Sequence, residues 1–171
     1  MILPIKNLAL QFQTNMSGTL NIDWLKLLVS DIFKDFKINF NDELFINKID
    51  EWLNKAKPGE IIYHPYISEA GERGPFINSN AKASIIGLRS NISFPEILRS
   101  FYEGLCFAAR ECYSAIGSPP DEIILAGGGS KSMVMRTIFS SILKCSVRII
   151  NRNEAGATGA AMIGAMSIGL Y

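Results

Sequence analysis

Apolar residues recur every three or four positions along several stretches of the chain, a spacing that predicts amphipathic α-helices. The first predicted helix includes Trp24 and Phe33 and takes Asn21 as its N-cap, because a short amide side chain there can bind free backbone N–H groups. The second begins at residues 41–42 and ends before residues 57–59, a lysine–proline–glycine turn. Two helices are therefore expected in the first third of the chain.

The longest predicted helix follows residues 68–91, a segment rich in glycine and asparagine that is expected to form a loop. Ser93 and Glu96 have the spacing of a capping box at the start of this helix. Apolar residues continue at helical spacing until residues 117–120, where a Gly-Ser-Pro-Pro sequence ends the helix.

Short apolar runs predict strands. Residues 8–13 alternate moderately, and residues 61–67 form a strand that Pro65 restricts to a sheet edge or an early end. The apolar run at 122–126 is typical of a buried central parallel strand, and residues 147–150 form another strand. Helices precede, separate and follow these last two strands. The order predicts an α/β fold in which helices cover a parallel or mixed sheet.

Composition excludes several classes of protein. With 171 residues that are 48% hydrophobic, the chain is expected to be one folded domain, residues 1–171. A net charge of +1 from interspersed residues predicts neither nucleic-acid binding nor attachment to an anionic membrane. Cys106, Cys112 and Cys145 lack metal-type spacing and are expected to be free thiols. Since no secretory signal is evident either, a cytoplasmic location is expected.

The C-terminal segment, residues 155–171, carries no charged side chain. It is shorter than the roughly 20 residues needed to span a bilayer, and it is rich in glycine and alanine. These features predict a buried helix, with Glu154 as its capping residue because a carboxylate is favourable at a helix N-terminus.

The most informative motif is a glycine-rich turn between the strand at 122–126 and the next helix. Gly127, Gly128 and Gly129 lack a Cβ, so a ligand can approach the backbone closely, and the helix that follows favours a phosphate group. Neither the Walker A loop nor the G-x-G-x-x-G fingerprint fits, since Ser130 and Ser132 stand where these patterns require glycine. The turn therefore predicts a nucleotide site of another kind, or a strand-to-helix turn without a ligand.

Other chemistry-bearing residues have structural interpretations. Glu72 and Arg73 are expected to form an ion pair that pins the long loop. His64 is the only histidine, so no His–Asp or histidine-rich metal site can form, and it is expected to pack at a sheet edge. No paired-carboxylate site is evident. Aromatic residues around this strand are expected in the core rather than stacked on a base: Tyr63, Tyr66 and Phe76.

Four motifs in order resemble the C-terminal ATPase lobe of the FGGY family of carbohydrate kinases. Residues 125–132 resemble its adenosine loop, and residues 154–161 resemble the start of its final helix. Residues 63–76 are similar to its Pro-Tyr…Gly-Glu-Arg-x-Pro stretch, and residues 83–103 to its second signature. The resemblance implies a ribonuclease H-like or actin-like ATPase lobe with a mixed β-sheet covered by helices.

Three positions depart from the family pattern. Phe101 stands where the signature has a smaller residue, and Lys82 where these kinases often have arginine; both differences are expected to affect packing rather than chemistry. Ser132 is shorter than the asparagine that related kinases carry near the adenine, so that contact is expected to be weaker.

The resemblance also implies roles. The three glycines are expected to lie against the ribose and α-phosphate of ATP, with hydroxyl groups offered by Ser130 and Ser132. Gly18 and Asp23, beside Trp24, resemble a helix that borders the adenine; the alternative is a core tryptophan with a solvated aspartate. Lys131 is expected to be solvated.

Complete kinases of this family carry the catalytic Asp and the sugar pocket in an N-terminal lobe, and this chain contains no Asp-x-Gly-Thr phosphate loop. It is therefore expected to be inactive alone, with no catalytic residue and no metal ligand of its own. Mg²⁺ would arrive with the phosphates of ATP or ADP. A sugar or polyol would bind only in the complete enzyme.

A second hypothesis is a non-catalytic actin-fold interaction domain that pairs with a partner protein or a separately encoded lobe. A lobe that faces another exposes surface that favours self-association, so a homodimer is also expected under this hypothesis.

Overall fold

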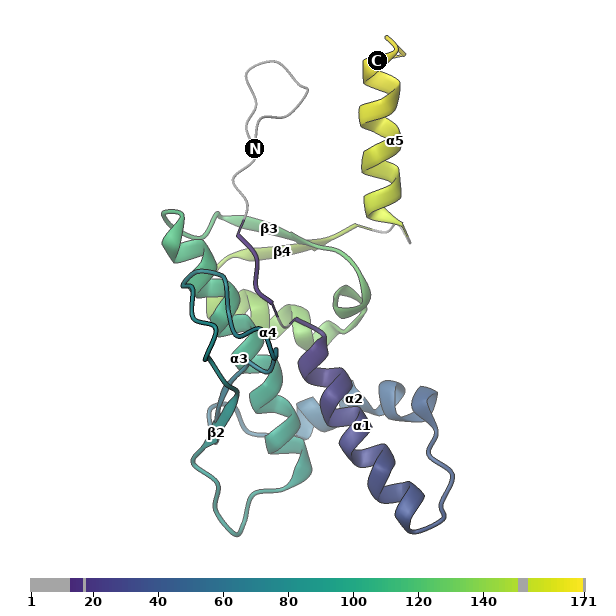
Figure 1. Ribbon diagram of the computed structural model, residues 1–171, viewed down its shortest axis with the longest axis vertical. Coiled ribbons are helices and arrows are strands. Elements are labelled where there is room, and N and C mark those ends of the chain that lie inside the picture. The colour runs from purple at the N-terminus through teal and green to yellow at the C-terminus, as the bar shows by residue number, and fades with distance from the viewer. Residues whose placement is uncertain (1–12, 17, 151–153, 171) are drawn as a thin grey trace.

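The computed structural model describes residues 13–16, 18–150 and 154–170 (Figure 1). Its elements, in chain order, are α1 (Leu20–Asp35), α2 (Asp42–Lys55), β1 (Ile62–His64), β2 (Ser84–Ile86), α3 (Phe94–Ala115), β3 (Glu122–Leu125), the 3₁₀ helix η1 (Gly128–Lys131), α4 (Met133–Leu143), β4 (Ser146–Ile149) and α5 (Ala155–Ser167). The predicted strand at residues 8–13 lies outside the described residues, except for Gln13.

The strands form two pairs. β1 and β2 are antiparallel, with Tyr63 opposite Ile85, and β1 ends before Pro65 as predicted. β2 lies within the segment that the sequence predicts to be loop. β3 and β4 are parallel, as predicted, with Ile123 opposite Val147. The described part of the chain therefore combines antiparallel and parallel pairing with helices.

The core forms around α3, which runs beneath the β3–β4 pair (Figure 1). Phe101 on α3 is fully buried, and the Tyr63 ring of β1 stacks on it at a centroid distance of 3.7 Å. The departure from the family pattern at this position thus serves packing. A smaller cluster, built on Ile123, Leu143 and Cys145, joins α4 to the parallel strand pair.

The local rules for helix starts succeed for α2 and α3 but not for α1. Asn41 is the N-cap of α2 and its Oδ1 accepts the Leu44 N–H at 2.8 Å. Ser93 opens α3 with the predicted capping box. Asn21 is not the N-cap of α1, since the helix begins at Leu20 and Thr19 holds that position. Asn21 is buried instead, and its Oδ1 accepts a hydrogen bond from the Tyr63 hydroxyl at 2.6 Å.

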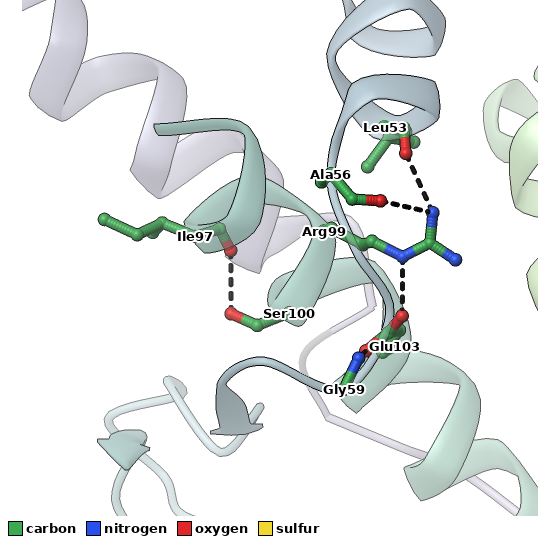
Figure 2. Close-up of polar contacts among 7 residues, drawn as sticks. All are labelled: Leu53, Ala56, Gly59, Ile97, Arg99, Ser100 and Glu103. Atoms are coloured by element: carbon green, nitrogen blue, oxygen red, sulfur yellow. Dashed lines mark hydrogen bonds and ion pairs between the residues drawn. The ribbon is translucent and has the colours of Figure 1, made fainter. Parts of the chain in front are cut away.

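Arg99 and Glu103 of α3 hold the C-terminal end of α2 (Figure 2). The Arg99 guanidinium donates to the Leu53 carbonyl at 2.8 Å and to Glu103 at 2.7 Å. Glu103 also accepts the Gly59 N–H at 3.1 Å. Because a cation is favourable beside the free carbonyl groups of a helix C-terminus, this cluster fixes α2 against α3.

Two burial predictions are wrong for the described residues. Residues 155–167 form the predicted helix, α5, but it stands away from the other elements (Figure 1) and Met162, Ile163 and Met166 are exposed. β3 is not buried on both faces, because α3 and α4 cover one face only and Ile124 is 46% exposed on the other. Apolar composition predicts a helix or strand, but burial requires a neighbour to pack against.

Tyrosine burial predicts how stability responds to alkaline pH. Burial raises the pKa of Tyr63 to about 12, and burial with the nearby Asp50 carboxylate raises the pKa of Tyr102 to about 12. Folding favours the neutral phenols, so their contribution is complete below about pH 10 and is lost as pH rises toward 12. Urea denaturation midpoints should fall between pH 9 and pH 11. A midpoint that stays constant to pH 11 would contradict this assignment, and the Tyr63→Phe variant should show a smaller fall.

Candidate functional site

The glycine loop, residues 127–132, forms one wall of a cavity of about 950 Å³. The start of α1 supplies another wall, and α2 supplies a third, with Tyr102 and Leu105 of α3 between them. The seven residues that the sequence predicts as a site all line this cavity: Gly18, Asp23, Gly127, Gly128, Gly129, Ser130 and Ser132. The fold therefore brings together two segments that lie more than 100 positions apart in the sequence.

The glycines of the loop are of two kinds. Gly127 follows β3 with φ of +82°, a backbone conformation that residues with a side chain rarely adopt. A Cβ added to Gly128 or Gly129 would meet no atom within 4 Å. These two glycines are thus not required for packing in the free protein, and they leave open space beside the backbone.

The serine hydroxyls of the loop bond within the protein. Ser130 is buried. Its backbone N–H donates to the Gly127 carbonyl at 3.2 Å, which closes the 3₁₀ turn, and its hydroxyl donates to the same carbonyl at 2.7 Å. Ser132 is the N-cap of α4: its Oγ accepts the Met135 N–H at 3.0 Å and donates to Asp50. Their contacts with a nucleotide stay a prediction. Lys131 is exposed, as expected for a solvated lysine, and lines the cavity from η1.

The α1 wall corresponds in part to the predicted adenine border. Asp23 is exposed and lines the cavity with Gly18. Trp24 points elsewhere: its ring lies parallel to that of Phe101 at a centroid distance of 6.2 Å, and it is 42% exposed. The tryptophan is therefore at the edge of the core and is not one of the residues that line the cavity.

Sequence reasoning missed the contribution of α2. Asn47 and Asp50 line the cavity, one helical turn apart on the same face as Ile46. Both Asp50 oxygens are engaged, since Oδ1 accepts the Ser132 hydroxyl at 2.5 Å and Oδ2 accepts the Met133 N–H at 3.2 Å. Helical periodicity could have shown that the two polar residues share a face, but not which loop that face meets.

The loop at residues 68–91 is held by contacts other than the predicted ion pair. Glu72 and Arg73 form no ion pair in the described part of the chain, and Arg73 is exposed. Glu72 is 1% exposed, and its Oε1 accepts the backbone N–H groups of Met16, Arg73 and Gly74 at 2.8–3.2 Å. The glutamate anchors the loop through backbone groups because a buried carboxylate needs donors, and nearby N–H groups supply them.

Two other predicted roles differ in detail. His64 lies on β1, where its Nδ1 is 2.8 Å from the Ser84 hydroxyl of β2 and its ring lies parallel to that of Tyr66 at a centroid distance of 6.4 Å, although the residue is exposed. Glu154 precedes α5, yet its side chain makes no capping hydrogen bond; its backbone carbonyl accepts from Thr158. Glu154 is thus the N-cap of α5, as predicted, without a side-chain hydrogen bond to the helix.

Two kinds of feature are absent from the described residues, a metal site and a membrane-spanning helix. No group of three or more His, Cys, Asp or Glu side chains there is placed to hold a metal ion. None of the described helices combines the length and apolar character that crossing a membrane requires.

Comparisons with known proteins identify the family to which this chain belongs. The model of the C-terminal domain of the FGGY family of carbohydrate kinases matches residues 6–168. Erythritol kinase of Brucella abortus (strain 2308) is 47% identical over 171 residues, 99% of this chain and 32% of that protein. This chain thus spans about a third of that relative's length.

Solved structures share the fold. Gluconate kinase from Lactobacillus acidophilus aligns with a TM-score of 0.73 at 22% identity, over 92% of this chain and 30% of that one. Xylulose kinase from Bifidobacterium adolescentis aligns with a TM-score of 0.65 at 28% identity, over 92% of this chain and 29% of that one.

Proposed function

Because this chain belongs to the FGGY family of carbohydrate kinases, as its match to the family's C-terminal domain shows, we propose that it is the ATP-binding lobe of a kinase that phosphorylates a sugar or polyol hydroxyl. The observation that carries the proposal is the cavity at the glycine loop. Its volume of about 950 Å³ lies within the range of small-molecule sites, and its open space beside Gly128 and Gly129 fits a nucleotide close to the backbone.

The proposed acceptor follows from the relatives. The 47% identity to a protein named erythritol kinase favours a polyol over a larger sugar. This chain supplies the nucleotide half, and a sugar-binding lobe supplies the acceptor and the general base. Phosphoryl transfer requires both reactants to be held in line, so we expect no activity from these residues alone. We propose that Mg²⁺ enters on the nucleotide phosphates.

Nucleotide binding can be measured residue by residue. An amide-resolved NMR titration with ADP and ATP, with and without Mg²⁺, should give saturable shifts centred on residues 127–132. Half of a kinase site is expected to bind with a Kd on the order of 1 mM, equivalent to about 4 kcal/mol. The absence of shifts at several millimolar nucleotide would contradict the proposal.

Gly128→Val is the sharpest variant for this site. The added Cβ meets nothing within 4 Å in the free protein, so the fold should be kept while the branched side chain fills space that the nucleotide needs. We expect at least tenfold weaker ADP binding. Gly164→Val is the matched control, because its Cβ also meets nothing within 4 Å and it lies on α5, away from the cavity. Equal affinity in both variants would exclude the glycine loop as the site.

A further inference from the structure

Asp50 is the residue of α2 that reaches across to the glycine loop. The carboxylate bonds both the Ser132 hydroxyl and the Met133 N–H, which lie 82 and 83 positions later in the chain. Both bonded residues lie where η1 ends and α4 begins. Asp50 therefore ties the exit of the loop to α2, which lines the same cavity.

The same contacts occupy the first turn of α4. Met133 is its first residue, and the Met133 N–H is bound by Asp50. The Met135 N–H is bound by the Ser132 hydroxyl oxygen, which in turn donates to Asp50. The N-terminal N–H groups and the positive end of a helix are the features that usually bind a phosphate. In this protein the Asp50 carboxylate already occupies the Met133 N–H, and the Ser132 hydroxyl occupies the Met135 N–H.

We propose that Asp50 is a positioning and selectivity residue of the nucleotide site: it fixes the glycine loop to α2 and keeps phosphate groups away from the N-terminus of α4. This inference rests on the proposed function for the identity of the ligand. A phosphate at α4 would have to displace two hydrogen bonds of Asp50 and then face its charge at close range. The phosphates of a bound nucleotide therefore extend away from the N-terminus of α4.

The test compares a neutral and an anionic probe on the whole chain. In the wild-type protein, adenosine should shift the amides of the loop, whereas pyrophosphate at several millimolar should leave the Met133 and Met135 amides unshifted. In Asp50→Asn, the side-chain oxygen can still accept from Ser132, but the amide nitrogen cannot accept from Met133. Removal of the charge and release of that N–H should strengthen pyrophosphate binding about tenfold and weaken adenosine binding severalfold.

Glu43→Gln is the matched control. It removes one negative charge from the same helix at an exposed position that does not line the cavity, so both affinities should stay unchanged. A purely structural role for Asp50 would weaken adenosine binding without strengthening pyrophosphate binding, and that result would overturn the proposal. Shifts of the Met133 amide on addition of pyrophosphate to the wild-type protein would also overturn the proposal. That measurement does not depend on the folding of any variant.

The two proposals fail in different ways. If neither adenosine nor ADP binds the wild-type chain, the proposed function is contradicted, but the pyrophosphate comparison still reports on Asp50. If adenosine binds and Asp50→Asn leaves pyrophosphate affinity within twofold of wild type, the result supports the nucleotide site but contradicts the proposed role of Asp50.

Discussion

Gly104→Val is expected to prevent stable folding of this chain. Gly104 lies on α3 where the helix meets β1, and a Cβ at that position would be 2.4 Å from the Tyr63 carbonyl oxygen and 3.2 Å from the Tyr63 ring. Contacts this short with backbone atoms require the strand to move. We expect a loss of more than about 3 kcal/mol in the free energy of unfolding.

Tyr63 cannot move away from α3 without further losses. Its ring is stacked on Phe101, one turn before Gly104, and its hydroxyl donates to the buried Asn21. Alanine at position 104 places the same Cβ there and gains only about 1 kcal/mol of helix propensity, so it should also destabilise the protein. Strand β1, helix α1 and helix α3 meet at Tyr63, which explains why the expected effect is large.

Urea denaturation followed by circular dichroism measures this effect. Gly164→Val on α5, whose added Cβ meets nothing within 4 Å, should unfold at the wild-type midpoint or slightly above it. Gly104→Ala with wild-type stability would show that β1 and α3 are farther apart in solution than described here.

Glu72→Ala should produce the second largest loss of stability. The variant leaves three backbone N–H groups without their shared acceptor, those of Met16, Arg73 and Gly74. An unsatisfied buried donor costs about 1–3 kcal/mol, and of the three bonds only that of the Gly74 N–H is fully buried, so a total of about 2 kcal/mol is expected. We also expect the loop after β1 to open, because Glu72 forms the isolated β-bridge with Asn78 that holds this loop together.

Two variants separate the role of the carboxylate from that of its neighbour. Glu72→Gln keeps one oxygen that can accept the same N–H groups, so its loss should be smaller. Arg73→Ala should stay within about 0.5 kcal/mol of wild type, since the exposed guanidinium forms no ion pair with Glu72 in the described residues. Urea denaturation midpoints measure the stability of each variant, and the rate of proteolysis in the loop measures whether the loop opens. Equal stability of Glu72→Ala and wild type would refute the anchoring role.

The sequence alone determined most of the local structure. Periodicity located the helices, and the start of α2 at residues 41–42 and the capping box at Ser93 were predicted because their hydrogen bonds lie within three residues of the chain. The parallel pairing of residues 122–125 with 146–149 followed from the helix between them. The family followed from motifs that are local as well. Each of these features depends on residues that are close together along the chain.

Only the tertiary structure decided burial and long-range contacts. It placed Gly18 and Gly127 on one cavity, added Asp50 from a helix that carried no motif, and left α5 exposed. An apolar or charged side chain does not specify its partner, since the partner depends on which elements pack together. For the same reason Asn21 became a buried acceptor for Tyr63 rather than a cap.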